Sequence, residues 1–398
     1  MLPAALLALS LLYAALLAAY RLGWRALPSQ TWPPPQEPAE HISVVIAARD
    51  EALHIGPCLR SILAGNYPPQ LFDICVADDG STDATAAEVL RVQAELAAAQ
   101  SPVRLRLLRI EPGGPDSQGL LPFGKKRALA AAIALASGPL IATTDADCVL
   151  PPDWLRSLGA ALAEPGRVMA AGPVAMHRVA GLLGHFQALD LAGMVGIAGA
   201  GLHMGWQRMG NGANLAFRKQ VYEEAGGYAS HGLVASGDDM FLMQEVAARH
   251  PQGLVFVKNR AALVLTRPEA TWAALGQQRL RWGSKNAALP EWRMRLALLL
   301  VLLTACGLLL LPVAAALLHG AGRQPPARLW AVAWVAACGI KALADYGLLR
   351  SMCGWLGRPE WMRWFGPSFF LHLLYLPGVG LASLFFRGYR WKGRRVKR

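Results

Sequence analysis

The chain has 398 residues, of which 54% are hydrophobic and only 16% are charged. If the apolar residues form long runs, this composition excludes an ordinary soluble protein. Such runs are present, and apolar stretches of about 18 or more residues can span a bilayer. The net charge of +13 is compatible with nucleic acid, anionic lipid or a phosphorylated substrate. Seven basic residues lie among the last twelve positions, directly after an apolar run. This placement suits the anionic face of a membrane bilayer and requires no nucleic acid.

The first apolar run predicts an N-terminal transmembrane anchor over residues 1–22. Residues 2–20 carry no charge, and Arg21 and Arg25 follow them. A cleaved signal peptide would carry its basic residues before the apolar stretch, so this order of charges favours an uncleaved anchor. The basic flank places the following chain in the cytoplasm. A linker over 23–40, rich in proline from 28 to 38, comes next.

The region 41–292 has the pattern of an α/β domain. Short apolar, β-branched runs alternate with Ala-rich helical stretches; these runs are ISVVIAA from Ile42, DICVA from Asp73, LRLLRI from Leu105 and PLIATT from Pro139. The alternation predicts a mostly parallel sheet. Ligands of such sheets bind beyond the carboxyl ends of the strands, so polar residues that directly follow a strand are candidates for chemistry.

The C-terminal region 293–388 contains about three apolar segments, near 296–318, 329–349 and 365–386, and a basic tail occupies 389–398. Three crossings would send this tail to the side opposite the α/β domain, against the tendency of basic segments to stay in the cytoplasm. Either this tendency fails here, or one segment is re-entrant or interfacial.

Acidic residues follow three of the predicted strands. Asp78 and Asp79 begin the sequence DDGSTD, and Glu51 follows the first strand. A turn with a helix cap would explain the glycine and the hydroxyl residues of that sequence, but not the paired acids, which can accept hydrogen bonds from a base or a ribose. Asp145 and Asp147 form a DxD pair, which is either a solvated loop or a site for a hard divalent cation.

Three further patterns lie later or between these clusters. Lys125 begins an Ala-rich helix, where an anion is favoured, although GLLPFGKK lacks the last residue of a P-loop. Asp239, preceded by Asp238, begins another helix, and acids at that position are also explained by the helix dipole alone. The sequence QRLRW from Gln278 to Trp282 lies in a basic amphipathic stretch that could simply rest on a membrane surface.

In this order and together, these patterns resemble a membrane-bound family 2 glycosyltransferase, of the branch that includes cellulose, chitin and hyaluronan synthases and ceramide glucosyltransferase. The resemblance covers about residues 40–290 in its motifs. It implies a GT-A fold, a nucleotide-sugar donor, usually a UDP-sugar, and Mg²⁺ or Mn²⁺ as cofactor. It also implies an integral membrane protein of the bacterial inner membrane, with the catalytic domain in the cytoplasm.

The resemblance assigns roles to the candidate residues. It implies that Asp239 is the catalytic base, although Asp238 stands where the family usually has glutamate. It implies that Asp145 and Asp147 hold the metal and that the donor is bound by Glu51, Asp78, Asp79, Lys125, Asp145, Gln278, Arg281 and Trp282. The expected reaction is an inverting hexosyl transfer from the nucleotide sugar.

The expected acceptor is a lipid or lipid-linked glycan. Residues 178–210 are apolar and glycine-rich and contain His185, Asp190 and His203, which predicts an amphipathic surface that lines an acceptor site at the bilayer. Asn211 to Asn214 replace the FFCGS-like motif of polysaccharide synthases, and few spans are available to build a channel. Processive polysaccharide synthesis is the alternative within the family. Outside the family, the alternatives are a membrane scaffold with an inactive domain and a nucleotidyltransferase that releases pyrophosphate.

Overall fold

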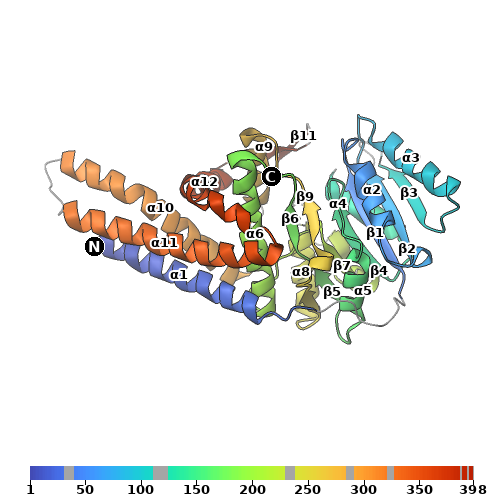
Figure 1. Cartoon of the computed structure of the whole chain (residues 1–398), viewed down its shortest axis with the longest axis horizontal. Helices are drawn as coiled ribbons and strands as arrows, with labels where there is room; N and C mark the ends of the chain where they lie inside the picture. The colour runs from blue at the N-terminus through green and yellow to red at the C-terminus, as the bar shows by residue number, and fades with distance from the viewer. Residues whose placement is uncertain are drawn as a thin grey trace.

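The computed structural model describes residues 1–30, 40–110, 124–228, 238–283, 291–320, 327–385, 388–391 and 394–397. They form an α/β domain and a bundle of long helices, joined by a glycine-rich helix between them (Figure 1). Residues 31–39 of the expected linker lie outside the described residues.

A seven-stranded sheet with the order β3-β2-β1-β4-β7-β5-β8 forms the centre of the α/β domain. Its first four strands are mutually parallel, and β7 runs antiparallel to β4 and β5. The strands are β1 (Ile42–Ala48), β2 (Phe72–Asp78), β3 (Arg104–Arg109), β4 (Leu140–Asp145), β5 (Met169–Ala171), β7 (Leu215–Arg218) and β8 (Leu254–Phe256). The prediction of a largely parallel α/β sheet is confirmed, with four strands at the predicted positions.

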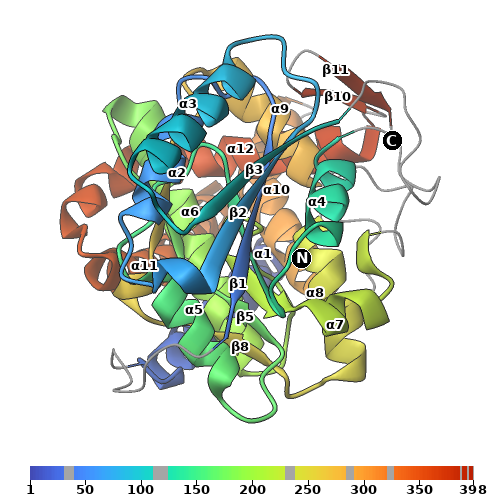
Figure 2. The same ribbon diagram turned by 90° about the vertical axis from the view of Figure 1, so that its right-hand side faces the viewer.

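Helices cover both faces of this sheet, which explains why its strands are apolar throughout. In β2 every residue is buried, and in β1 only one is half-buried. Figure 2 shows α2, α3 and α5 along one side of the strands and α4 along the other. The helices of the domain are α2 (Ile55–Leu63), α3 (Thr85–Ala98), α4 (Lys125–Ala134), α5 (Trp154–Ala163), α7 (Lys219–Glu224) and α8 (Asp238–Arg249).

A small parallel pair, β6 (Val174–Met176) and β9 (Val264–Thr266), extends the domain toward the helix bundle. Helix α6 (Gly181–His203) follows β6, and helix α9 (Trp272–Gly283) follows β9. Both connections therefore carry the chain from the sheet to the boundary between the domain and the bundle.

Three helices make up the bundle: α1 (Leu2–Ala26), α10 (Trp292–Gly320) and α11 (Ala327–Leu356). Near one end, Leu6 packs with Leu308 and Ala337. At the other, Trp24 meets Trp355 edge to face with 5.1 Å between ring centroids, and contacts Phe256 of β8. Helices α1 and α11 therefore run toward the α/β domain and α10 runs away from it, with the N-terminus at the far end (Figure 1). Helix α1 continues to Ala26, beyond the expected end of the anchor, because its last turn packs on the domain.

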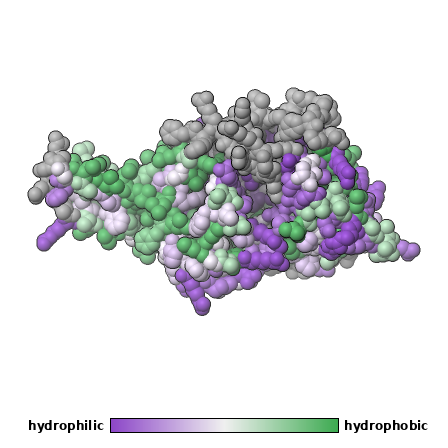
Figure 3. All heavy atoms as spheres, turned by 90° about the horizontal axis from the view of Figure 1, so that it is seen from above, coloured by the Kyte–Doolittle hydropathy of each residue, from purple (hydrophilic) through white to green (hydrophobic). Residues whose placement is uncertain are grey.

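Five helices in the described part of the chain are long and apolar enough to cross a membrane: α1, α6, α10, α11 and a segment over Pro359–Ala382 that overlaps most of α12 (Phe365–Phe385). Hydrophobic residues gather over the helix bundle, whereas the visible face of the α/β domain is mostly hydrophilic (Figure 3). This distribution favours association with a membrane through the bundle.

Helix α12 packs against α6 and α9 as well as against α10 of the bundle. A short 3₁₀ helix (Pro359–Trp364) links it to the domain-facing end of α11. It packs against α9, and β10 (Gly388–Trp391), which pairs with β11 (Arg394–Lys397), also contacts α9 (Figure 1). This packing favours the re-entrant or interfacial possibility, and the number of crossings stays a prediction.

Helix α6 is not the amphipathic surface that the sequence predicts. It packs against α1, α11, α12 and the small sheet, so most of its circumference is buried. Its glycines permit this close packing: a methyl group at Gly199 would lie 2.7 Å from the Trp24 ring, and one at Gly196 would lie 2.7 Å from the sulfur of Met352. The glycine-rich composition reflects contacts between helices, not contact with lipid headgroups.

Candidate active site

The loops after β1 and β2 are held together at the carboxyl edge of the sheet. The backbone N–H of Asp50 donates to Ser81 Oγ at 3.0 Å, and the Thr82 N–H donates to Asp50 Oδ1 at 2.8 Å. Arg49 Nη1 donates to the Asp79 carbonyl at 2.7 Å. These bonds fix the Asp79 side chain beside the first loop, although the two loops are about 30 residues apart in sequence.

The two acids of the DDGSTD sequence have different surroundings. Asp78 is buried and accepts a hydrogen bond from the Ser81 N–H at 2.9 Å, so it stabilises the turn and does not line the cavity described below. Asp79 lines that cavity. Glu51 also lines it and lies 2.8 Å from His54 Nδ1. The structure thus brings Asp79 and Glu51 to one edge, with Asp78 behind them.

The DxD pair lies at the end of β4, in the same cavity. Asp145 forms an ion pair with Lys125 at the start of α4. Asp147 accepts a hydrogen bond from Thr266 Oγ1 at 3.3 Å. Burial, reinforced by the carboxylates of Asp145 and Glu51, raises the pKa of Asp147 to about 6. Concentrated negative charge of this kind favours binding of a cation.

The donor set fits a divalent metal that shares its coordination with a phosphorylated ligand. Among the described residues, no group of three or more His, Cys, Asp and Glu side chains is arranged to hold a metal ion. Mg²⁺, however, usually takes only one or two protein carboxylates and completes its shell with phosphate oxygens and water. Asp145 and Asp147 can supply that number.

Asp239, near the start of α8, faces the same region across Gly212. Its Oδ2 accepts the Gly212 N–H at 3.0 Å, and its Oδ1 accepts the Met240 N–H at 2.8 Å. Thr143 Oγ1 of β4 donates to the Gly212 carbonyl at 2.8 Å. A Cβ built at Gly212 would lie 3.7 Å from Lys125 Nζ and 3.8 Å from Asp239 Oδ2. The lysine, the glycine and the aspartate are therefore neighbours, whereas the Asp238 side chain lies outside the described residues.

The loop that carries Gly212 is anchored by Asn214, which is completely buried. Its amide nitrogen donates to the carbonyls of Pro173 and Ala262 at 2.8 and 2.7 Å, and its Oδ1 accepts the indole N–H of Trp154 at 2.9 Å. Every polar atom of this side chain is thus engaged. The asparagines that replace the synthase motif include one whose role is to hold the loop.

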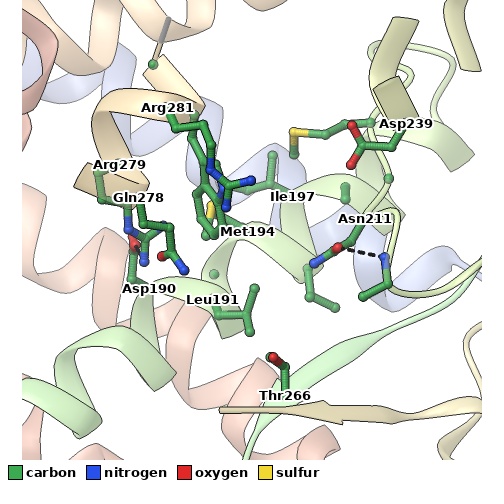
Figure 4. Close-up of a pocket in the computed structure, with 18 of the residues that line it drawn as sticks. Asp190, Leu191, Met194, Ile197, Asn211, Asp239, Thr266, Gln278, Arg279 and Arg281 are labelled. Atoms are coloured by element: carbon green, nitrogen blue, oxygen red, sulfur yellow. Dashed lines mark hydrogen bonds and ion pairs between the residues drawn. The ribbon is translucent and has the colours of Figure 1, made fainter. Parts of the chain in front are cut away.

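Helix α9 brings the QRLRW sequence to the opposite side of the cavity. Gln278, Arg281 and Trp282 all line it. Gln278 Nε2 donates to Glu269 Oε1 at 2.8 Å. Figure 4 shows Gln278 close to Arg279 and Asp190, and it shows Arg281 between Gln278 and Asp239.

One cavity of about 1160 Å³ connects these groups. Of the ten candidate site residues, all except Asp78 line it: Glu51, Asp79, Lys125, Asp145, Asp147, Asp239, Gln278, Arg281 and Trp282. The cavity continues from this polar end between apolar side chains of α6, α10 and α12, which include Leu189, Met194, Ile197, Leu298, Leu302, Phe369 and Leu376. The polar chemistry and the helix bundle thus share one space.

Of the three residues of α6 expected to line an acceptor site, one lines the cavity and two do not. Asp190 lines the cavity. His185 does not: its ring stacks on Trp364 with 4.7 Å between centroids. His203 is exposed at the end of α6 and also lies outside the cavity lining. The expectation that both histidines line an acceptor site is therefore wrong for this cavity, because neither of them lines it.

Several lining residues were not recognised as functional candidates from sequence. Arg49, Thr266 and Gly212 touch the predicted acids, and Arg279 pairs with Asp190. Only Arg279 had a signal, since it lies inside the QRLRW sequence. The apolar arm of the cavity could not be read from sequence, because its walls come from five helices far apart along the chain: α1, α6, α10, α11 and α12.

The sheet carries acids at the carboxyl ends of its strands, and the cavity beside them opens toward apolar helices. This arrangement is that of a GT-A glycosyltransferase associated with a membrane. The chain belongs to glycosyltransferase family 2: the family model described as "Glycosyltransferase like family 2" matches residues 38–284, which is more than half of the chain. It is therefore an enzyme of the glycosyltransferase class.

Known proteins agree with this fold. The mannosyltransferase PcManGT from Pyrobaculum calidifontis, solved with GDP-Man and Mn²⁺, superposes with a TM-score of 0.61 at 21% identity, over 97% of this chain and 99% of its own. The beta-monoglucosyldiacylglycerol synthase of Synechocystis sp. is 27% identical over 128 residues. That match covers 32% of this chain and spans only 24% of the relative's length.

Proposed function

We propose that this protein transfers a sugar from a nucleotide sugar, with a UDP-sugar as the first candidate, to a lipid or lipid-linked acceptor at the membrane. The transfer is a single inverting displacement that depends on Mg²⁺ or Mn²⁺. The observation that carries this proposal is the single cavity that joins the acids of the sheet edge to apolar side chains of α6, α10 and α12. A soluble acceptor would not require an apolar arm that opens into a helix bundle.

The donor occupies the polar end of the cavity. Asp79 and Glu51 bind the base and ribose, while Lys125 and Arg281 face the diphosphate. Asp145 and Asp147 would hold the metal, which when bound neutralises the negative charge that develops on the leaving diphosphate. The solved complex of PcManGT with GDP-Man and Mn²⁺ supports a donor and metal of this type.

Asp239 acts as the general base. As the acceptor hydroxyl oxygen attacks the anomeric carbon, its proton passes to Asp239, and the electron pair of the broken carbon–oxygen bond leaves with the nucleoside diphosphate. The N–H groups of Gly212 and Met240 hold the carboxylate in place. Because a single displacement needs one base and no covalent intermediate, a second catalytic acid is not required.

The acceptor is a lipid, because its reactive hydroxyl must reach Asp239 while the rest of the molecule lies among apolar side chains. The name of the Synechocystis relative, a diacylglycerol glucosyltransferase, supports an acceptor of this class. Polysaccharide synthesis is less well supported, since a growing glycan requires a channel lined by polar groups, whereas this arm of the cavity is predominantly apolar.

The α/β domain faces the cytoplasm of a bacterial cell and the bundle lies in the inner membrane. Arg21 and Arg25 lie in the part of α1 nearest the domain, as expected for a cytoplasmic flank. The strands of the basic tail also lie on the domain side of α12.

The test is nucleoside diphosphate release by the purified full chain in detergent, supplied with membrane lipids and a panel of UDP- and GDP-sugars. We expect sugar-selective release that is abolished by EDTA and by Asp147→Asn. Asp239→Asn should bind the nucleotide sugar normally, but its rate of sugar transfer, measured as nucleoside diphosphate formed, should be about 10²- to 10⁴-fold lower. Glu40→Gln, at a surface ion pair with Arg218, is the control and should change nothing.

Other results would contradict the proposal. Release of pyrophosphate would identify a nucleotidyltransferase. Failure to bind any nucleotide in the presence of metal would favour the scaffold. Full activity of Asp239→Asn would remove this residue from the mechanism.

A further inference from the structure

The Arg279–Asp190 pair lies where the polar end of the cavity meets its apolar arm. Arg279, on α9, is 2% exposed, and Asp190, on α6, is 14% exposed. Arg279 Nη2 lies 2.8 Å from Asp190 Oδ2, and both residues line the cavity. Figure 4 shows the two side chains together beside Gln278, across the cavity from Asp239.

This pair has hydrogen-bonding capacity that nothing in the described part of the chain uses. Although the charges are close, Nε and Nη2 of Arg279 and Oδ2 of Asp190 make no hydrogen bond of acceptable geometry there. Gln278 Oε1 is in the same condition. Buried polar groups are normally hydrogen-bonded, so unused donors and acceptors on three residues that line one cavity indicate a polar ligand.

The neighbouring polar groups, in contrast, form a closed framework. The Gln187 amide exchanges hydrogen bonds with the backbone of Glu269 at 2.8 and 3.0 Å, and the Glu269 carboxylate accepts the Gln278 Nε2–H. The Arg279 guanidinium also stacks on the Trp282 ring, 4.2 Å from its centroid. The framework fixes α9 against α6, so the unused groups are held in place by their surroundings.

The charge of this site selects its ligand. Arg279 is balanced by Asp190, so the pair offers donors and acceptors without net charge. A phosphate would meet the Asp190 carboxylate as well as the arginine, and this repulsion disfavours it. A neutral hydroxyl group can donate to Asp190 and accept from Arg279 at the same time. Asp345, which also lines the cavity, is likewise paired with a buried cation, Lys341.

Given the proposed function, on which this inference rests, we propose that the Arg279–Asp190 pair, with Gln278 Oε1, binds the uncharged polar headgroup of the acceptor and positions its hydroxyl toward Asp239. The acceptor is therefore a neutral hydroxyl lipid, such as a diacylglycerol, and not a polyprenyl phosphate. Asp190 and Arg279 are positioning and specificity residues, whereas Asp239 performs the proton transfer.

The experiment measures sugar transfer by the full chain in detergent to two probe acceptors, dioleoylglycerol and a polyprenyl phosphate, with kcat and KM determined for donor and acceptor. The wild-type protein should prefer dioleoylglycerol. The charge-neutral double variant Asp190→Asn/Arg279→Gln should raise the KM for dioleoylglycerol about tenfold or more, with the donor KM within about twofold of wild type.

The single variant Asp190→Asn gives a sharper result because it leaves the charge of Arg279 uncompensated. The ratio of kcat/KM for polyprenyl phosphate to that for dioleoylglycerol should rise about tenfold. A matched control removes a different ion pair, Arg218–Glu40 at 3.0 Å, through Arg218→Gln/Glu40→Gln, and should leave this ratio unchanged. Nucleotide-induced thermal stabilisation verifies that each variant is folded.

The outcomes separate the two levels of the argument. If the wild-type protein releases no nucleoside diphosphate with any membrane lipid, the proposed function fails and this inference fails with it; if it uses other membrane lipids but neither probe, the inference alone is overturned. If it glycosylates dioleoylglycerol but the variants raise donor and acceptor KM equally, or leave the preference ratio unmoved, the inference alone is overturned. Preference of the wild-type protein for polyprenyl phosphate also overturns it and would assign the site to a lipid phosphate.

Discussion

At the scale of single residues, the polar end of the cavity depends on a position without a side chain. Gly212 carries the N–H that binds Asp239, and the space beside its Cα lies within 4 Å of both Lys125 Nζ and Asp239 Oδ2. Under the proposed function, any side chain here would enter the region of the donor's diphosphate and sugar. The backbone of Gly212 has no positive φ, so the space for the ligand, and not the backbone, favours glycine.

Gly212→Ala should therefore separate activity from stability. The added methyl group makes only ordinary contacts, so the melting temperature should not change, but kcat/KM for the donor should fall about tenfold or more because the reacting groups are displaced. Thermal unfolding and steady-state kinetics measure the two effects. Unchanged kinetics would mean that the donor does not pass between Lys125 and Asp239.

Gly172→Ala is the matched comparison, since its Cβ would lie 2.3 Å from Asn214 Nδ2. Asn214 is buried and cannot move without losing its hydrogen bonds. We expect this variant to lower the free energy of unfolding by about 1–3 kcal/mol. A melting temperature equal to that of wild type would show that the loop anchored by Asn214 can relax.

At the scale of elements, α1 and α11 are joined by a buried polar cluster within otherwise apolar helices. Lys341 is fully buried and donates to Asp345 Oδ2 at 2.5 Å, and Tyr13 Oη donates to the other oxygen of Asp345 at 2.5 Å. The Lys341 ammonium also lies 5.3 Å from the centre of the Phe369 ring of α12. One cluster thus links three helices.

Removing one charge of this cluster should cost more than removing both. Lys341→Met leaves Asp345 buried without its cation, which typically costs about 3–5 kcal/mol, whereas Lys341→Met/Asp345→Leu leaves no unpaired charge and should recover most of that loss. The melting temperatures of both variants in detergent measure the two losses. Stabilisation by added nucleotide shows in each case that the α/β domain is folded. Equal melting temperatures for the two variants would show that the pair does not stabilise the bundle.

The predictability of these elements depends on how far apart their partners lie in sequence. The strands ending at Ala48, Asp78 and Asp145 were predictable because apolar runs and the acids after them are local patterns. The burial of α6 was not, since Trp24 and Met352, which pack on its glycines, are distant in sequence. Arg279 and Asp190 are separated by 89 residues, so their pairing could not be predicted either.

At the scale of the whole molecule, one cavity lies at the boundary between bundle and domain, and the proposed function places acceptor and donor at its opposite ends. Helices α1, α10 and α11 extend away from the domain, and α12 returns to it, so the strands that follow α12 lie beside α9. Helix α12, one of the helices that line the apolar arm, therefore does not follow the bundle. A lipid can meet the donor there without leaving the apolar phase.

This arrangement predicts a membrane topology with an odd number of crossings between the N-terminus and the catalytic domain, and none in α12. A green fluorescent protein fused after residue 398 should fluoresce, because the proposed orientation puts both it and the domain in the cytoplasm. Alkaline phosphatase fused after residue 322, between α10 and α11, should be active, because that end of the bundle faces the periplasm. Alkaline phosphatase activity of a fusion after residue 398 would show that α12 crosses the bilayer, and the acceptor arm between α6, α10 and α12 would then run through the membrane instead of along its cytoplasmic face.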